Sequence, residues 1–241
     1  LGWRLVRLHS PLAPGRALIP HLRIDLALLR GVLRVGIPTG VQMIVISLAE
    51  LALLGLVNGY GSQATAAYGA VNQVVAYVQF PAISIAITTS ILGAQAIGAG
   101  RLHTLGAIVR TALWMNVVLT GALVLLGYLF SRPLMGVFIT SPDVVDVAQT
   151  LLHISLWSMV VFGMASVLSG VMRASGAVLV PTGIAIACIA LVEIPAALLL
   201  SQRFGLNGVW MAYPINFVAM LLLQTAYYRL VWRKKPIRRL V

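Results

Sequence analysis

The chain has 241 residues, of which 60% are hydrophobic and only 9% are charged. Its mean hydropathy of +0.99 means more apolar surface than a soluble domain can bury in one core. These values exclude an ordinary soluble domain. They predict an all-α, polytopic membrane protein that is embedded in the lipid bilayer. The formal net charge of +12 suits nucleic acid, but the basic residues gather at the two ends and in short loops between apolar runs. That distribution is typical of membrane topology, so we expect no nucleic-acid partner.

The first 31 residues are rich in arginine and are broken by prolines and a glycine. Within them and just beyond, His21 to Leu33 predicts an amphipathic interfacial helix on anionic lipid. We therefore divide the chain into a cytoplasmic linker (1–31), a six-helix transmembrane lobe (32–230) and a basic cytoplasmic tail (231–241). The first methionine is Met43, so we expect the sequence to be a piece of a longer protein.

Six apolar runs follow, each with roughly the 20 residues needed to cross a hydrocarbon layer about 30 Å thick. They lie near 35–57, 66–97, 107–130, 146–172, 178–202 and 208–230. With this count, 15 of the 17 Lys and Arg residues fall on one side and only Arg132 and Arg203 on the other. The asymmetry predicts that both ends are cytoplasmic, in the inner membrane of a cell.

Two carboxylates lie inside these spans, Glu50 in the first and Glu193 in the fifth. Glu50 is about 22 Å along its span, and Glu193 reaches a similar depth, so the two acids can line one cavity. In one reading, Glu50 exchanges a proton or binds a cation, because desolvation favours the neutral acid and a water-filled state favours the charged one. In the other, each acid pins helices by a hydrogen bond. We favour the first reading for Glu50 and the second for Glu193, beside Pro195.

The second span carries two polar rows at helical spacing, which either join helices or line a pathway. We favour cavity lining and name as candidates Tyr68, Asn72, Gln73, Tyr77 and Gln79. The further candidates for cavity residues are Gln42, Ser47, Trp157 and Met164. A lone polar residue such as Gln42 or Asn116 is more often an interhelical hydrogen bond. An aromatic residue or methionine is more often core.

Motifs for chemistry are missing from the sequence. It has no phosphate-binding Gly-Lys-Ser/Thr loop, no paired histidines and a single cysteine, Cys188, in an apolar run. We expect neither an enzyme nor a catalytic residue, metal site or organic cofactor, and we interpret Cys188 as a core residue.

Six fragments in order resemble the carboxy-terminal lobe of the multidrug and toxic compound extrusion (MATE) family, nearest its DinF-like branch. They are Arg34-Val-Gly-Ile-Pro38, Tyr60-Gly-Ser62 leading to Ala66-Ala-Tyr-Gly69, Gln79-Phe-Pro81, Gly93-Ala-Gln-Ala-Ile-Gly-Ala-Gly100, Ser169-Gly-Val-Met-Arg-Ala-Ser-Gly176 and Gly205-Leu-Asn-Gly-Val-Trp210. The resemblance implies a twelve-helix exporter of two six-helix lobes, with a central cavity that opens alternately to either side. This chain then holds spans seven to twelve, residues 1–31 include the interlobe linker, and the amino-terminal lobe is a missing partner.

By the same resemblance, the protein is a proton- or sodium-coupled antiporter that exports drugs or other small amphipathic or cationic organic compounds. Some members carry an acid in the seventh span, where Glu50 lies. Others use an acid in the tenth span, but the stretch from Trp157 to Ser166 has none, so the coupling ion stays open. Two other functions also remain open: a non-transporting scaffold or partner subunit, and a flippase for lipid-linked precursors from the same superfamily.

Overall fold

The computed structural model describes residues 25–234, and every regular element among them is helical. The linker predicted for 1–31 and the tail predicted for 231–241 lie mostly outside the described residues. The chain divides between Ile37 and Pro38 into two units, and the packing below is that of the second. The elements in order are α2 (Leu26–Asn58), α3 (Ser62–Gly98), η2 (Leu102–Thr104), α4 (Leu105–Leu129), α5 (Ser131–Phe138), α6 (Pro142–Leu156), α7 (Ser158–Ala174), α8 (Leu179–Cys188), η3 (Ile189–Glu193), α9 (Ile194–Phe204), α10 (Leu206–Leu230) and η4 (Trp232–Lys234).

Within residues 25–234, six helical stretches are long and apolar enough to cross a membrane. Their bounds are Leu29–Asn58, Ser62–Gly98, Leu102–Leu129, Pro142–Ala174, Leu179–Phe204 and Leu206–Lys234. The prediction of six spans and an all-α fold is confirmed, with most ends within a few residues of those expected.

Three local features were not predicted. The fourth span breaks at Trp157 into α6 and α7, and the fifth contains a π-helical turn, η3, directly before α9. Pro195 has no backbone N–H to donate to the preceding turn, and the wider π turn takes up this mismatch, with the Ile194 N–H bonded to the Ile189 carbonyl. The short helix α5 between the third and fourth spans was also missed.

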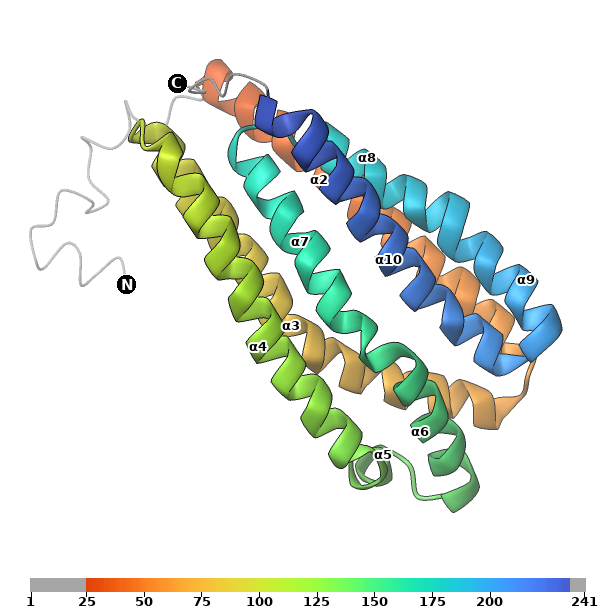
Figure 1. The fold of residues 1–241 in the computed structure, drawn as a ribbon. Coiled ribbons are helices and arrows are strands. Elements are labelled where there is room, and N and C mark those ends of the chain that lie inside the picture. The colour runs from red at the N-terminus through yellow and green to blue at the C-terminus, as the bar shows by residue number, and fades with distance from the viewer. Residues whose placement is uncertain (1–24, 235–241) are drawn as a thin grey trace, which may run out of the picture. The chain divides into compact units, whose positions relative to one another are not determined.

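Helix α7 packs against α3, α4 and α10 and passes between them in Figure 1. Close approach is possible because α7 carries glycines at its crossings. A Cβ atom added to Gly170 would lie 2.4 Å from the carbonyl oxygen of Ala86 on α3, and one added to Gly163 would overlap the Asn116 side chain of α4. Cys188 is a free, buried cysteine, as predicted.

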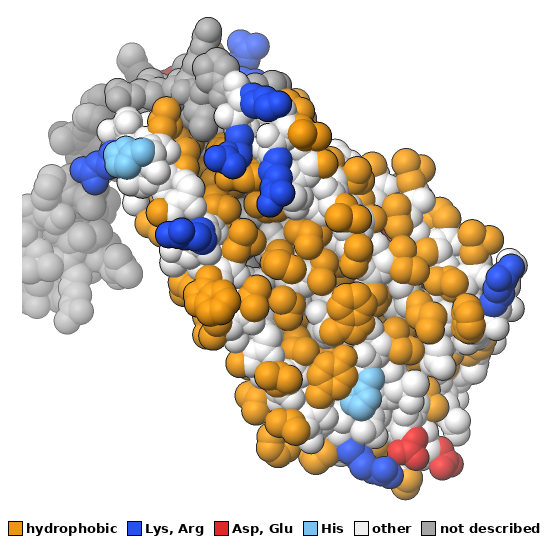
Figure 2. All heavy atoms as spheres, in the orientation of Figure 1, with side chains coloured by type: hydrophobic (Ala, Val, Ile, Leu, Met, Phe, Trp, Pro, Cys, Tyr) orange, Lys and Arg blue, Asp and Glu red, His pale blue; other side chains and the backbone are white. Residues whose placement is uncertain are grey.

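The end of the unit where α3 meets α4 and α7 meets α8 has a small core of its own, which includes Ile97, Leu105, Val171 and Trp232. The Trp232 Nε1 donates to Ser175 Oγ over 2.8 Å. Figure 2 shows several blue Lys and Arg side chains gathered over one end of the helices. The grouping agrees with the charge asymmetry read from the sequence.

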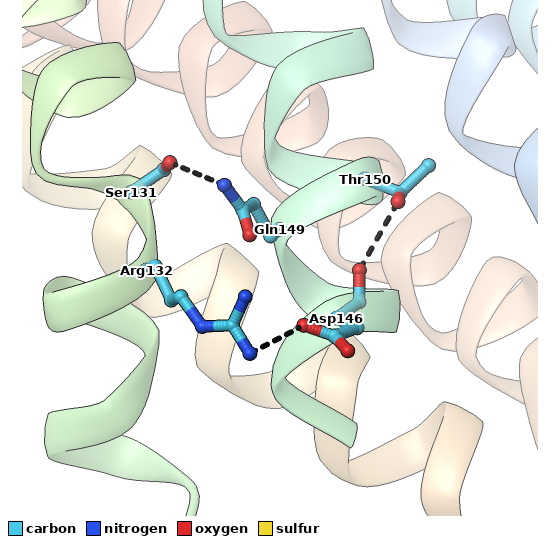
Figure 3. A network of polar contacts seen from close by, with 5 residues as sticks. All are labelled: Ser131, Arg132, Asp146, Gln149 and Thr150. Carbon is cyan, nitrogen blue, oxygen red and sulfur yellow. Dashed lines mark hydrogen bonds and ion pairs between the residues drawn. The ribbon is translucent and has the colours of Figure 1, made fainter. Parts of the chain in front are cut away.

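At the opposite end, α5 and α6 are joined by polar contacts (Figure 3). Gln149 Nε2 donates to Ser131 Oγ over 2.9 Å, and Arg132 Nη2 lies 3.2 Å from Asp146 Oδ1. These contacts hold the short helix against the start of the fourth span.

Candidate functional site

Glu193 is the last residue of the π turn and is buried within the lobe, with 5% of its surface exposed. Its Oε2 accepts a hydrogen bond from Nδ2 of Asn216 on α10, a residue that is only 3% exposed. The Asn216 Oδ1 is also buried and has no hydrogen-bond partner among the described residues. The fifth and sixth spans are therefore joined by a hydrogen bond between a carboxyl and an amide group, and the amide oxygen of Asn216 accepts no hydrogen bond from the described residues.

Glu50 lies on α2 and is exposed on this lobe, whereas its neighbours Ala49 and Leu53 are buried. The two acids nevertheless lie near enough for the charge of Glu50 to act on Glu193. Tyr213 of α10 lies near both acids. The fold thus brings the two predicted acids into one polar cluster, with Glu193 inside the lobe and Glu50 at its surface.

Tyr68 of α3 completes this cluster. It is 5% exposed, and its hydroxyl lies 3.1 Å from that of Tyr213. The rings of Tyr68 and Trp210 are 5.4 Å apart, and those of Trp210 and Tyr213 are 5.6 Å apart. Tyr68 therefore lies in the interior of the lobe and ties α3 to α10.

Beyond Tyr68, one whole face of α3 is left uncovered by the lobe. Its exposed positions are Ser62, Gln63, Ala66, Gly69, Gln73, Tyr77, Phe80, Ile83, Ser84, Ile87, Thr88, Ile91, Leu92, Ala94, Gln95 and Gly98. Seven of these sixteen have polar side chains, and five of the seven, Gln73, Tyr77, Ser84, Thr88 and Gln95, follow one side of the helix at intervals of four or seven residues. On α4, by contrast, the exposed positions after Thr111 are all apolar, including Trp114, Val118, Leu125 and Leu129. The exposed positions of the two helices therefore differ in composition.

The other predicted cavity residues fall into two groups. Gln42, Asn72, Gln79 and Met164 are half-buried; Ser47, Gln73, Tyr77 and Trp157 are exposed. Trp157 lies at the break between α6 and α7. Asn116 joins two helices as expected, because its Nδ2 donates to the Val160 carbonyl over 3.1 Å.

The reading of the sequence missed Asn216 and Tyr213. The sequence does contain an indication of Asn216, because this amide lies in the middle of the apolar sixth span, where a polar side chain needs a hydrogen-bond partner. The partner itself could not be identified without knowing which faces of the fifth and sixth spans meet.

The fold and the polar groups within it define a multi-pass membrane protein built as one bundle of six spanning helices. The family model described as MatE matches residues 38–199, and the chain belongs to this family, as its sequence fragments indicated.

Among curated relatives, the chain is similar to the probable multidrug resistance protein YoeA of Bacillus subtilis (strain 168), with 45% identity over 96% of this chain and 50% of that protein. It is also similar to the probable multidrug resistance protein NorM of Thermotoga maritima, with 25% identity over 86% of this chain and 45% of that protein. The chain thus spans about half the length of the curated relatives it matches.

Solved structures share the fold. The Vibrio cholerae MATE transporter VcmN in its bent form superposes with a TM-score of 0.80 at 16% identity, over 95% of this chain and 51% of that one. A MOP superfamily transporter from Pyrococcus furiosus superposes with a TM-score of 0.72 at 21% identity, over 89% of this chain and 47% of that one. The six-helix bundle therefore corresponds to one lobe of such transporters.

Proposed function

We propose that this chain is one lobe of a cation-coupled antiporter that exports drugs or other toxic organic compounds in exchange for protons or sodium ions. Its membership of the MatE family and its similarity to proteins named for multidrug resistance support this function. The second, amino-terminal lobe is the partner, and the cavity between the lobes opens alternately to the two sides. We place the protein in the cell's inner membrane with both ends cytoplasmic, as the Lys and Arg distribution suggests.

The observation that carries the proposal is the polar face of α3. Exposed amide and hydroxyl groups at intervals along a spanning helix are costly against lipid, because hydrocarbon offers them no hydrogen bonds. The exposed face of α4 has the composition that lipid favours. The simplest arrangement therefore turns α4 to the bilayer and α3 to a water-filled cavity shared with the other lobe.

This face also suits the proposed substrates. Tyr77 and Phe80 form an edge-to-face pair with ring centroids 6.1 Å apart, and both are exposed. Aromatic rings beside a few amides and hydroxyls bind amphipathic organic molecules, and the rings attract cations. From Ser62 to Gly98, α3 has no charged residue, so it does not repel a cationic substrate.

Glu50 is the coupling acid in this proposal. An ionised carboxylate at mid-membrane costs roughly 2.5–3.5 kcal/mol on insertion scales, so an exposed one needs water, a proton or a cation. In the state open to water the acid is charged, and in the closed state it holds a proton or a sodium ion. The alternation couples ion entry to substrate exit.

The test is transport by the full-length protein in inverted membrane vesicles. Under an imposed pH gradient, Glu50→Gln should reduce movement of a cationic dye by about tenfold or more, a loss of roughly 1.4 kcal/mol in transition-state stabilisation. Asp146→Asn, the same acid-to-amide change at an exposed residue of α6, is the matched control and should transport normally. Undiminished transport by Glu50→Gln would remove this residue from the mechanism. Replacing the pH gradient by a sodium gradient identifies the coupling ion.

A further inference from the structure

Glu193 and Asn216 form a buried polar pair that the coupling proposed for Glu50 does not use. Each residue is at least nine-tenths buried. One hydrogen bond joins them, from Asn216 Nδ2 to Glu193 Oε2, and the Asn216 Oδ1 beside it has no partner among the described residues. An unmet buried acceptor next to a carboxyl group needs a donor.

We propose that Glu193 and Asn216 form a proton-binding pair, in which Asn216 recognises the protonated carboxyl group and holds it inside the lobe. This inference rests on the proposed function, to which it adds a second proton site besides Glu50.

The chemistry of the two groups is complementary only when Glu193 is protonated. A carboxylate has no hydrogen to donate, so an amide can give it a hydrogen bond but leaves its own oxygen unmet. A carboxylic acid has a donor and an acceptor side by side, as a primary amide does. With one proton on Oε1, Glu193 accepts from Nδ2 and donates to Oδ1, and the unmet acceptor gains its partner. The proton comes from water and returns to water.

The same geometry argues for a proton over a sodium ion. A bound cation needs oxygen atoms directed at it. Here, Asn216 points its N–H group, not its oxygen, at the carboxyl, so in this orientation the amide offers no ligand to a metal ion between the two groups.

Glu193 has few charged or titratable neighbours. The nearby acid on α2 is Glu50. Tyr213 on α10 lies in the same cluster and is bonded to Tyr68 of α3. On the adjoining α8 and α9, the groups are Cys188, which is buried, and Arg203, ten residues on and so about 15 Å along the helix. Among residues 25–234, Glu193 forms no salt bridge with a Lys or Arg side chain.

The first test is thermal unfolding of the purified full-length protein in detergent, from about pH 5.5 to about pH 9, a range that covers documented buried glutamates. Protonation stabilises the folded state in this pair, so the wild-type midpoint should fall by several degrees as pH rises. Glu193→Gln is a permanently neutral mimic whose amide makes both bonds to Asn216, and its midpoint should stay nearly flat. Glu50→Gln serves as the control and should keep a clear decline. An equal slope in wild type and Glu193→Gln would overturn the proposal. So would recovery of the wild-type midpoint at high pH by sodium chloride but not potassium chloride.

A second measurement does not depend on stability. Infrared difference spectra between acid and alkaline pH, recorded on the full-length protein in lipid, should show the C=O band of a protonated carboxyl that Glu193→Gln removes. In Asn216→Ala the band should shift to higher frequency, because the bond to the amide oxygen is lost. A spectrum unchanged by Glu193→Gln would overturn the proposal. Neither measurement requires transport, so the two proposals are tested separately. The proposal for Glu193 and Asn216 can be wrong while Glu50→Gln still abolishes efflux, and it can be right if Glu50→Gln transports normally.

Discussion

The hydroxyl oxygens of Tyr68 and Tyr213 lie 3.1 Å apart, joining α3 to α10 across 145 positions of the sequence. Tyr213 is three residues before Asn216, so the two side chains lie on neighbouring positions of one helical face. The hydrogen bond between the two tyrosines ties α3 to α10, the helix whose Asn216 donates a hydrogen bond to Glu193.

Removing either hydroxyl of the tyrosine pair should weaken the lobe modestly. We expect Tyr68→Phe and Tyr213→Phe each to lower the free energy of unfolding by about 0.6 kcal/mol, and by no more than about 1.7 kcal/mol, the range measured for such bonds between spanning helices. The rings and their packing on Trp210 remain. The double variant should lose little more than either single one, because both remove the same bond. Unfolding in mixed detergent micelles measures this, and fully additive losses would show that the two hydroxyls act separately.

The close approach of Gly163 on α7 to the Asn116 side chain on α4 can be tested with two single variants and their combination. A Cβ on Gly163 would lie 1.9 Å from Asn116 Oδ1, so Gly163→Ala should destabilise the protein by about 1–3 kcal/mol through overpacking. Asn116→Ala makes room for the methyl group but gives up the bonds from Asn116 to Val160 and Thr120. The double variant should therefore be more stable than the sum of the two single changes predicts. Simple additivity would mean that the crossing of α4 and α7 relaxes by another route.

The ion pair of Arg132 and Asp146 should contribute little to the stability of the folded protein. The side chains are 64% and 60% exposed, and pairs this open contribute about 0–1 kcal/mol, less in high salt. We expect Asp146→Asn to leave the unfolding midpoint within about 2–3 °C of wild type. Gln149→Leu, which removes the adjacent contact to the buried Ser131, provides the comparison, and it should cost more. A larger effect of Asp146→Asn than of Gln149→Leu would contradict this ranking.

The two faces proposed for cavity and lipid can be separated by cysteine labelling. Cys188 is 1% exposed, so Cys188→Ala should give a background with little change. Single cysteines introduced by Gln73→Cys and Thr88→Cys on α3 should react with a water-soluble thiol reagent about tenfold faster than those from Val118→Cys and Leu125→Cys on α4. The thiolate that reacts forms in water, not in hydrocarbon. Equal rates in the full-length protein would undo the assignment of the faces.

The number of spans was readable from the sequence because each apolar run has the length that a bilayer requires, and the short polar turns between them show where each run ends. Local breaks were not readable. The π turn before Pro195 and the division of the fourth span at Trp157 depend on how the helices must adapt to their neighbours. The residues around them continue the same apolar pattern.

For Glu50 and Glu193, the sequence predicts the depth of each acid along its span but not whether its side chain is buried. Their depths followed from counting residues at 1.5 Å each, and the structure brings them into one cluster. Their surroundings differ, however, because Glu193 is buried and Glu50 is exposed on the lobe. Depth depends on position along one helix, whereas burial depends on the rotation of that helix about its axis.

The amino-acid sequence by itself determined the six spanning helices, the uneven charge of their two ends and the MatE family, since each depends on composition, length or local order. Only the tertiary structure decided that Asn216 pairs with Glu193, that Tyr68 lies inside the lobe, and that one polar face of α3 is left uncovered. These features arise from contacts between helices far apart in the chain. In a uniformly apolar bundle, the hydrophobic pattern does not specify which sides of the helices meet.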